Sequence, residues 1–195
     1  SKAEEKASLF DTRVFDSPED LIEAVDVVYV LTNMETHHAY CMQAIEAGKH
    51  VLVEKPTAVT IEEIEEIKAF AHQKGVQVAP VHNYVYEAPV MRAKELIESG
   101  KLGDLVSIYV LYNIHHPEEV AARYPGVIRQ ILTHHAYCTL YLVGQPQLVS
   151  CMKATVNDGS VPQENLAMVT MKMRNNALSH PVSYTHLRAH ETVVH

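Results

Sequence analysis

The sequence has no long apolar run, no block of basic residues and few cysteines. No apolar segment approaches the roughly 20 residues that a helix needs to cross a bilayer, so we expect no membrane-spanning helix. Sixteen Lys and Arg residues stand against 24 Asp and Glu residues, and this acidic balance argues against nucleic acid as a partner. The three cysteines, Cys41, Cys138 and Cys151, are too few and too scattered for a disulfide framework or a Cys-rich zinc site. They are typical of reduced thiols in a cytoplasmic protein.

Neither end of the 195-residue chain has the pattern of a domain boundary. It begins at Ser1 without an initiator Met or a signal-peptide pattern and enters helix and strand signals at once, as if the start of a domain were missing. After Pro181 the strand pattern shows no clear continuation, and Val182 to Thr192 resembles a translated sequencing-library adapter. We therefore expect residues 182–195 to be an artefactual tail without function; the alternative is a genuine polar terminus.

Residues 1–82 alternate between strand and helix patterns. A β-branched run over residues 25–31 is typical of a strand buried on both faces. Thr60 and Glu63 form a capping box at the start of a helix that Gly75 ends. Short connections between alternating elements predict a parallel sheet, which is half of a doubly wound α/β fold. The elements predicted here are strands over 25–31, 50–54 and 76–81, and helices that begin after Ser17 and over 36–47 and 61–74.

The pattern changes after residue 82, where we place a domain boundary. Pro89 opens a helix that ends at Ser99 and Gly100, and a long strand follows. The second domain is expected over residues 83–181. Its further predicted elements are a strand over 105–112, a loop over 113–126, a helix over 127–142 and two adjacent strands over 148–156 and 165–173.

Polar residues follow the first two predicted strands. In an open α/β sheet, ligands bind outside the carboxyl ends of the strands. The segment TNMETHH follows the first strand, and Glu54, Lys55 and Pro56 follow the second. A lysine between a strand end and a proline is held by a stiff backbone, which suits a catalytic group. The alternative is that Lys55 is an ordinary surface lysine in a loop.

The stretch TNMETHHAYCMQAIEAGKHVLVEKP, residues 32–56, resembles the signature region of the Gfo/Idh/MocA oxidoreductases, the glucose–fructose oxidoreductase and inositol dehydrogenase family. The likeness continues through HNY (82–84) and AKELIESGKLGDLVSIYV (93–110). It implies a Rossmann domain that binds NAD or NADP, followed by an α/β domain with an open, mostly antiparallel sheet. It also implies that the chain is truncated at both ends, with the G-x-G-x-x-G turn upstream. We therefore expect this piece to bind a dinucleotide poorly and to be inactive.

The resemblance assigns Lys55 to the substrate oxygen beside the nicotinamide. A cation there stabilises a developing alkoxide and positions the carbon for hydride transfer. For His37, a loop histidine that caps the next helix is an equal alternative to a cofactor contact. The residues that the resemblance places at the cofactor are Thr32, Asn33, His37, Glu54, Lys55, Pro56 and Asn83.

A second family signature, an Asp and a His four residues apart on a helix, aligns with residues 126–144. His134 takes the histidine position, while Gln130 stands where the aspartate is expected and Leu132 replaces the usual glycine. Imidazole titrates near working pH, which suits His134 to general base catalysis. A neutral amide orients the ring without stabilising imidazolium, so we expect His134 to be a weaker base or His135 to share the role.

Paired histidines at 37–38, 115–116 and 134–135 suggest a metal site, but none of the pairs has the spacing of ligands on one helical face, and we expect no metal. From the position of their loop alone, we expect His115, His116 or Arg123 to line the substrate pocket, and His135 beside His134 is a further candidate for substrate binding. The sequence therefore predicts an NAD(P)-dependent oxidoreductase that acts on a sugar or polyol, in a parent that is a homo-oligomer. The alternatives are a non-catalytic family member that binds a dinucleotide or sugar, and a metal-dependent lyase or isomerase.

Overall fold

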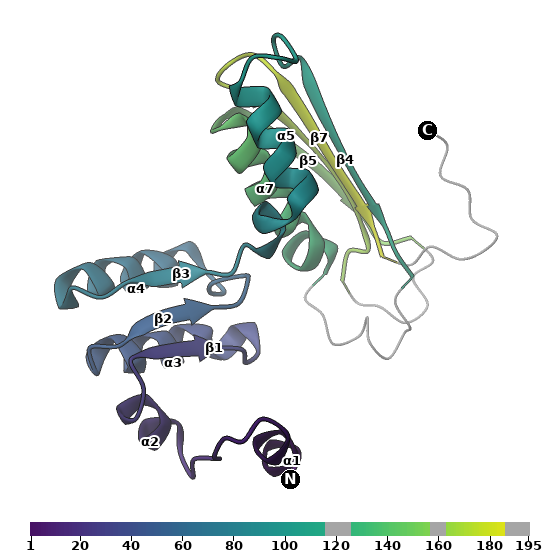
Figure 1. The fold of residues 1–195 in the computed structure, drawn as a ribbon. Coiled ribbons are helices and arrows are strands. Elements are labelled where there is room, and N and C mark those ends of the chain that lie inside the picture. Colours follow the sequence, from purple (N-terminus) through teal and green to yellow (C-terminus); the bar gives the residue numbers. More distant parts are fainter. Residues whose placement is uncertain (116–125, 157–162, 186–195) are drawn as a thin grey trace. The chain divides into compact units, whose positions relative to one another are not determined.

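The computed structural model describes residues 1–115, 126–156 and 163–185, and the chain divides into two compact units, residues 1–81 and 82–195 (Figure 1). Each unit has its own sheet and its own hydrophobic core. Within the described residues, no helix is long and apolar enough to cross a membrane.

The first unit is built on a parallel sheet of three strands in the order β1-β2-β3. Val28 of β1 lies opposite Val51 of β2, which in turn lies opposite Val78 of β3. This confirms the predicted parallel half of a doubly wound fold. Its elements are α1 (Lys2–Leu9), α2 (Pro18–Glu23), β1 (Val27–Val30), α3 (Met34–Glu46), β2 (His50–Val53), α4 (Ile61–Lys74) and β3 (Val78–Pro80).

One face of this sheet is packed and the other is open. Val28 and Val30 are buried in a core with Ile45 of α3, whereas Val27 and Tyr29 of the same strand are 49% and 45% exposed. The expectation that this strand is buried on both faces is therefore wrong. Because side chains alternate along a strand, the helices that cover Val28 and Val30 leave their neighbours uncovered.

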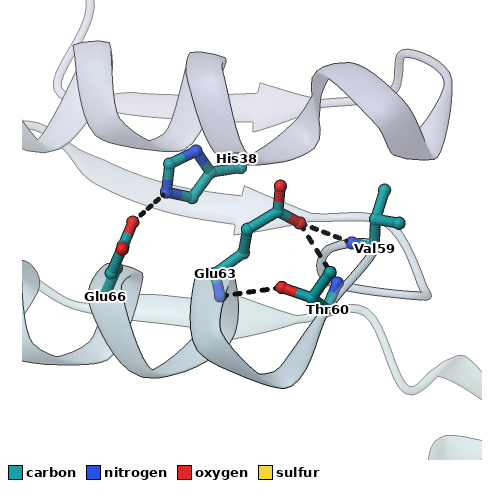
Figure 2. Close-up of polar contacts among 5 residues, drawn as sticks. All are labelled: His38, Val59, Thr60, Glu63 and Glu66. Atoms are coloured by element: carbon teal, nitrogen blue, oxygen red, sulfur yellow. Dashed lines mark hydrogen bonds and ion pairs between the residues drawn. The ribbon is translucent and has the colours of Figure 1, made fainter.

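Local side-chain caps begin α2 and α4 where the sequence predicts them. Ser17 caps α2, with Pro18 in its first turn. At α4, the Thr60 hydroxyl accepts from the Glu63 N–H at 3.2 Å, and the Glu63 carboxylate accepts from the N–H groups of Val59 and Thr60 (Figure 2). The box satisfies backbone donors that a helix start otherwise leaves without partners.

Thr60→Ala is expected to lower the free energy of unfolding by about 1 kcal/mol, because the Glu63 N–H loses its acceptor. Urea unfolding followed by far-ultraviolet circular dichroism measures the change. Thr60→Ser keeps the hydroxyl and should lower the free energy of unfolding much less. Equal losses in the two variants would mean that the hydroxyl is not the source of the stabilisation.

The second unit has a mixed, mostly antiparallel sheet of four strands in the order β4-β7-β6-β5. Among the described strands of this sheet, β4 and β7 pair in parallel and the other neighbours are antiparallel. In Figure 1 the helices α5 and α7 lie on one side of this sheet. This agrees with the expected α/β domain with an open, mostly antiparallel sheet. The elements are η1 (Asn83–Tyr86), α5 (Ala88–Glu98), β4 (Ser107–Asn113), η2 (Ile128–Leu132), α7 (Thr133–Val143), β5 (Pro146–Ala154), β6 (Leu166–Met173) and β7 (Leu178–Tyr184).

Strand β7 continues beyond Pro181. Val182 lies opposite Leu111 of β4, and Ser183 is fully buried. The expectation that the strand pattern stops at Pro181 is therefore wrong for residues 182–184. Pro181 and Ser183 alternate with less buried neighbours, and small buried side chains of this kind do not give a hydrophobic signal in the sequence. Residues 186–195 lie outside the described residues, and their artefactual origin stays a prediction.

The predicted helix over 127–142 is not regular, because its first part, η2, is a π-helix. The Thr133 N–H donates to the Ile128 carbonyl, five residues back, and the Thr133 hydroxyl donates to the Arg129 carbonyl at 2.8 Å. A threonine hydroxyl that bonds a preceding carbonyl competes with the regular ladder, and π segments concentrate at functional sites. The regular helix then runs through α7 to Gly144.

Candidate functional site

The turn after β2 is braced by a carboxylate. Tyr29 of β1 donates its hydroxyl to Glu54 Oε1 at 2.8 Å, and the Lys55 N–H lies 3.2 Å from Glu54 Oε2. The hydrogen bond to this carboxylate raises the pKa of Tyr29. Glu54 therefore joins the carboxyl ends of two neighbouring strands at the point where Lys55 leaves the sheet.

Lys55 is half-buried at this turn and precedes a cis peptide bond to Pro56. Burial lowers the pKa of Lys55 below its ordinary value, and the nearby charge of Glu54 offsets part of that effect. A lysine whose pKa is lowered gives up its proton more readily than a surface lysine does. This environment favours the functional interpretation of Lys55 over an ordinary loop lysine.

His37 connects the loops that follow β1 and β2. It is 1% exposed, with Nδ1 2.8 Å from the Pro56 carbonyl and Nε2 2.9 Å from the Thr32 carbonyl. One ring thus spans two loops that are separated by more than twenty residues in the sequence. Its contacts within this unit favour a role in positioning these loops.

Thr32 and Asn33 are exposed at the start of α3. The Thr36 hydroxyl lies 2.7 Å from Thr32 Oγ1 and 2.8 Å from the Asn33 carbonyl, so this loop is held in place from the first turn of the helix. A cavity of about 530 Å³ lies along β1, lined by mostly apolar surface of α1, α2, β1 and the segment 10–17 between the two helices, and it includes Thr32. Polar groups at the carboxyl edge beside an apolar cavity suit a ligand with both characters, as a dinucleotide has.

The second unit contains a compact cluster of aromatic and polar side chains from η1 and α7. The Tyr137 hydroxyl lies 2.5 Å from His134 Nδ1, 3.1 Å from Asn83 Oδ1 and 3.3 Å from the Tyr84 backbone N–H. The Tyr84 ring stacks on His134, and the His82 ring stacks on Tyr137, each with ring centroids 4.3 Å apart. His134 and Tyr137 are both buried.

The residue that sequence reasoning missed here is Tyr137. Burial raises its pKa to about 12, so its hydroxyl keeps its proton at working pH. The only signal in the sequence is its place three residues after His134, on the same side of a helix. Its hydrogen bond brings Asn83 and His134, two of the predicted site residues, into one cluster.

The other predicted residues of the second unit have different surroundings. His135 is buried, its Nδ1 lies 3.3 Å from the Ser183 hydroxyl, and burial lowers its pKa to about 4. This environment favours a packing role over substrate binding. Gln130 is half-buried in η2, and His115 is exposed shortly after β4. The remaining two predicted substrate contacts, His116 and Arg123, lie outside the described residues.

Within the described part of the chain, no group of His, Cys, Asp and Glu side chains could hold a metal ion.

Two family sequence models match the chain. One, described as "Oxidoreductase family, NAD-binding Rossmann fold", matches residues 1–82. The other, described as "GFO/IDH/MocA C-terminal domain", matches residues 90–193.

Known proteins resemble the chain over part of their length. It is 37% identical over 130 residues to the uncharacterized oxidoreductase YhhX of Escherichia coli and 36% identical over 134 residues to the scyllo-inositol 2-dehydrogenase (NADP(+)) IolW of Bacillus subtilis. Each alignment covers 65% of the chain but only 37% of the relative. The solved structure of the putative oxidoreductase YvaA of Bacillus subtilis is similar with a TM-score of 0.86 and 27% identity, over 97% of this chain and 56% of that one.

Proposed function

Since the chain belongs to the Gfo/Idh/MocA oxidoreductase family, we propose that it is part of an NAD(P)-dependent oxidoreductase that transfers hydride between a nicotinamide and a sugar or polyol. The observation that carries the proposal is the environment of Lys55. It stands at the carboxyl end of a Rossmann strand, its pKa is lowered by burial, and its turn is held by Glu54 and His37. The kinship with IolW, which is named for its action on an inositol, supports a polyhydroxylated substrate.

In this proposal, Lys55 donates a hydrogen bond to the reacting oxygen of the substrate and stabilises its developing negative charge. His134 accepts the proton that the hydroxyl group loses. Thr32, Asn33, Glu54 and Pro56 hold the cofactor beside the carboxyl ends of the strands. When bound, the nicotinamide supplies the carbon that accepts or donates hydride.

The test is to assay the complete parent protein against a panel of sugars and polyols that includes inositols. Absorbance of reduced nicotinamide reports turnover with NAD or NADP, and calorimetry reports binding. We expect turnover with at least one member of the panel. Binding of cofactor and sugar without turnover would instead support the non-catalytic alternative, and turnover that a chelator abolishes would support a metal-dependent one.

We also propose that the parent is a cytoplasmic homo-oligomer that associates through the uncovered face of the second sheet. Tyr109 and Met168 are exposed on this face, where the Tyr109 ring stacks on His180. Tyr109→Lys places a charge on this exposed face and should shift the parent to smaller species in size-exclusion chromatography with light scattering. Tyr86→Lys, at an equally exposed tyrosine away from the sheet, should not. Retention of the original mass by Tyr109→Lys would exclude this face as the interface.

A further inference from the structure

We propose that Tyr137 is a positioning residue that holds His134 in the tautomer with its proton on Nδ1, so that Nε2 is the nitrogen able to accept a proton. This inference rests on the proposed function, in which His134 is the acid–base group. It is argued from the three hydrogen-bond contacts of the Tyr137 hydroxyl, all of which are within the second unit.

The donors and acceptors around the Tyr137 hydroxyl determine which ring nitrogen carries the proton. A tyrosine hydroxyl has one proton to donate and can accept hydrogen bonds at its oxygen. The Tyr84 backbone N–H can only donate, so it donates to the Tyr137 hydroxyl oxygen, with 3.3 Å between the nitrogen and the oxygen. Asn83 Oδ1 can only accept, so it takes the hydroxyl proton at 3.1 Å. Since the hydroxyl proton is used by Asn83, the Tyr137 oxygen can only accept from His134, and His134 Nδ1 must carry the proton that it donates to this oxygen.

Ring packing keeps this arrangement in place. The Tyr84 ring lies nearly parallel to the His134 ring, at an interplanar angle of 19°, and the His82 ring lies at 16° to the Tyr137 ring. Both central rings are buried, so a change in the orientation of the imidazole or the phenol would require the stacked rings to repack. Burial also raises the pKa of Tyr137 to about 12, so the hydroxyl remains a donor to Asn83 at working pH.

In this proposal, the Tyr137 hydroxyl takes over the orienting role of the aspartate that the family resemblance leads one to expect at the position of Gln130. A carboxylate next to an imidazole fixes its tautomer and also stabilises imidazolium by its charge. The Tyr137 hydroxyl fixes the tautomer without adding a negative charge. Its place three residues after His134 puts both side chains on the same side of α7, so the positioning contact comes from the turn that follows His134.

Nitrogen-15 NMR of the histidines in the 195-residue chain tests the proposal directly, because protonated and unprotonated ring nitrogens have distinct chemical shifts. At a pH where His134 is neutral, its signals, assigned by their loss in His134→Gln, should show the proton on Nδ1. Tyr137→Phe keeps the stacked ring but removes the hydroxyl, and should shift most of the population to the tautomer with the proton on Nε2. The matched control Tyr141→Phe, two residues before the end of the same helix, should leave the tautomer unchanged.

Asn83 provides a second variant that keeps Tyr137 intact. Asn83→Ala removes the acceptor of the hydroxyl proton, which then becomes available to His134 Nδ1, and should favour the same change of tautomer. Asn83→Asp still accepts the proton and should preserve the original state. A wild-type signal with the proton on Nε2, or a tautomer that is the same in Tyr137→Phe and Asn83→Ala as in the wild type, would overturn the proposal.

Activity of the complete parent separates this inference from the proposed function. Tyr137→Phe should lower kcat on the order of ten- to a hundredfold with KM little changed, a smaller loss than removal of a general base causes. Tyr141→Phe should retain the wild-type kcat. If the parent shows no hydride transfer but the tautomer changes as described, the proposed function fails and the positioning role of Tyr137 stands. If the parent is active but the tautomer does not respond, the positioning role fails alone.

Discussion

Lys55→Met in the complete parent protein is expected to lower kcat by about 10²- to 10⁴-fold, the range that general acid–base and oxyanion-stabilising groups contribute. Methionine keeps the length and the apolar stem of lysine but cannot donate a hydrogen bond or carry a charge. The developing negative charge on the substrate oxygen would then lose its donor. Initial-rate measurement of nicotinamide reduction at saturating cofactor gives kcat and KM separately.

Lys68→Met is the matched control, because Lys68 is an exposed residue of α4 whose ion pair is with Glu65 on the same helix. It should leave kcat close to the wild-type value. If Lys55→Met behaves like Lys68→Met, Lys55 has no part in the mechanism. The pH profile adds a second readout: since burial lowers the pKa of Lys55, the activity that needs its ammonium form should fall at a lower pH than an ordinary lysine would give.

His37→Ala is expected to lower the free energy of unfolding of the chain by about 2–4 kcal/mol. The substitution removes a fully buried ring whose two nitrogens lie 2.8 and 2.9 Å from the carbonyls of Pro56 and Thr32, and the carbonyl to which the ring donates loses its donor. It also releases the two loops that the ring holds together, so we expect weaker cofactor binding by the parent. Urea unfolding and calorimetric titration measure the two effects.

The neighbouring histidine provides the control. His38 is half-buried, and its Nε2 lies 2.9 Å from the exposed carboxylate of Glu66 on α4 (Figure 2). A contact with an exposed carboxylate contributes at most about 1 kcal/mol even when both groups are charged, so His38→Ala should cost much less than His37→Ala. A comparable loss in both variants would mean that the bridge between the loops does not stabilise the unit.

The sequence predicts features that depend on a few neighbouring residues. The caps at Ser17 and Thr60 and the alternation that gives the parallel sheet are of this kind, and the structure confirms them. The contact between Tyr137 and Asn83 could not be predicted, because it joins residues 54 positions apart and depends on how α7 packs beside η1. Nor does the doublet His134–His135 reveal which ring joins this cluster, since adjacent helical side chains point in different directions.

The π segment also escapes prediction from periodicity, because it changes the helical register by one residue without leaving a gap in the apolar pattern. The open face of the first sheet was missed for a different reason. A β-branched run such as residues 25–31 satisfies the pattern of a fully buried strand even where only alternate side chains find packing partners.

The order of strands in the second sheet has a consequence for biosynthesis. Strand β4 pairs with β7, and the paired residues Ser107 and Leu178 are far apart in the sequence. In the first sheet the paired residues Val27 and His50 are much closer in the sequence. On the ribosome, the first unit can acquire its strand pairs early, while β4 has no strand to join until the segment that forms β7 has emerged. Contacts between segments so distant in sequence slow folding, and we expect the second unit to be the later and slower one to form, with an unpaired strand open to chaperones in the meantime.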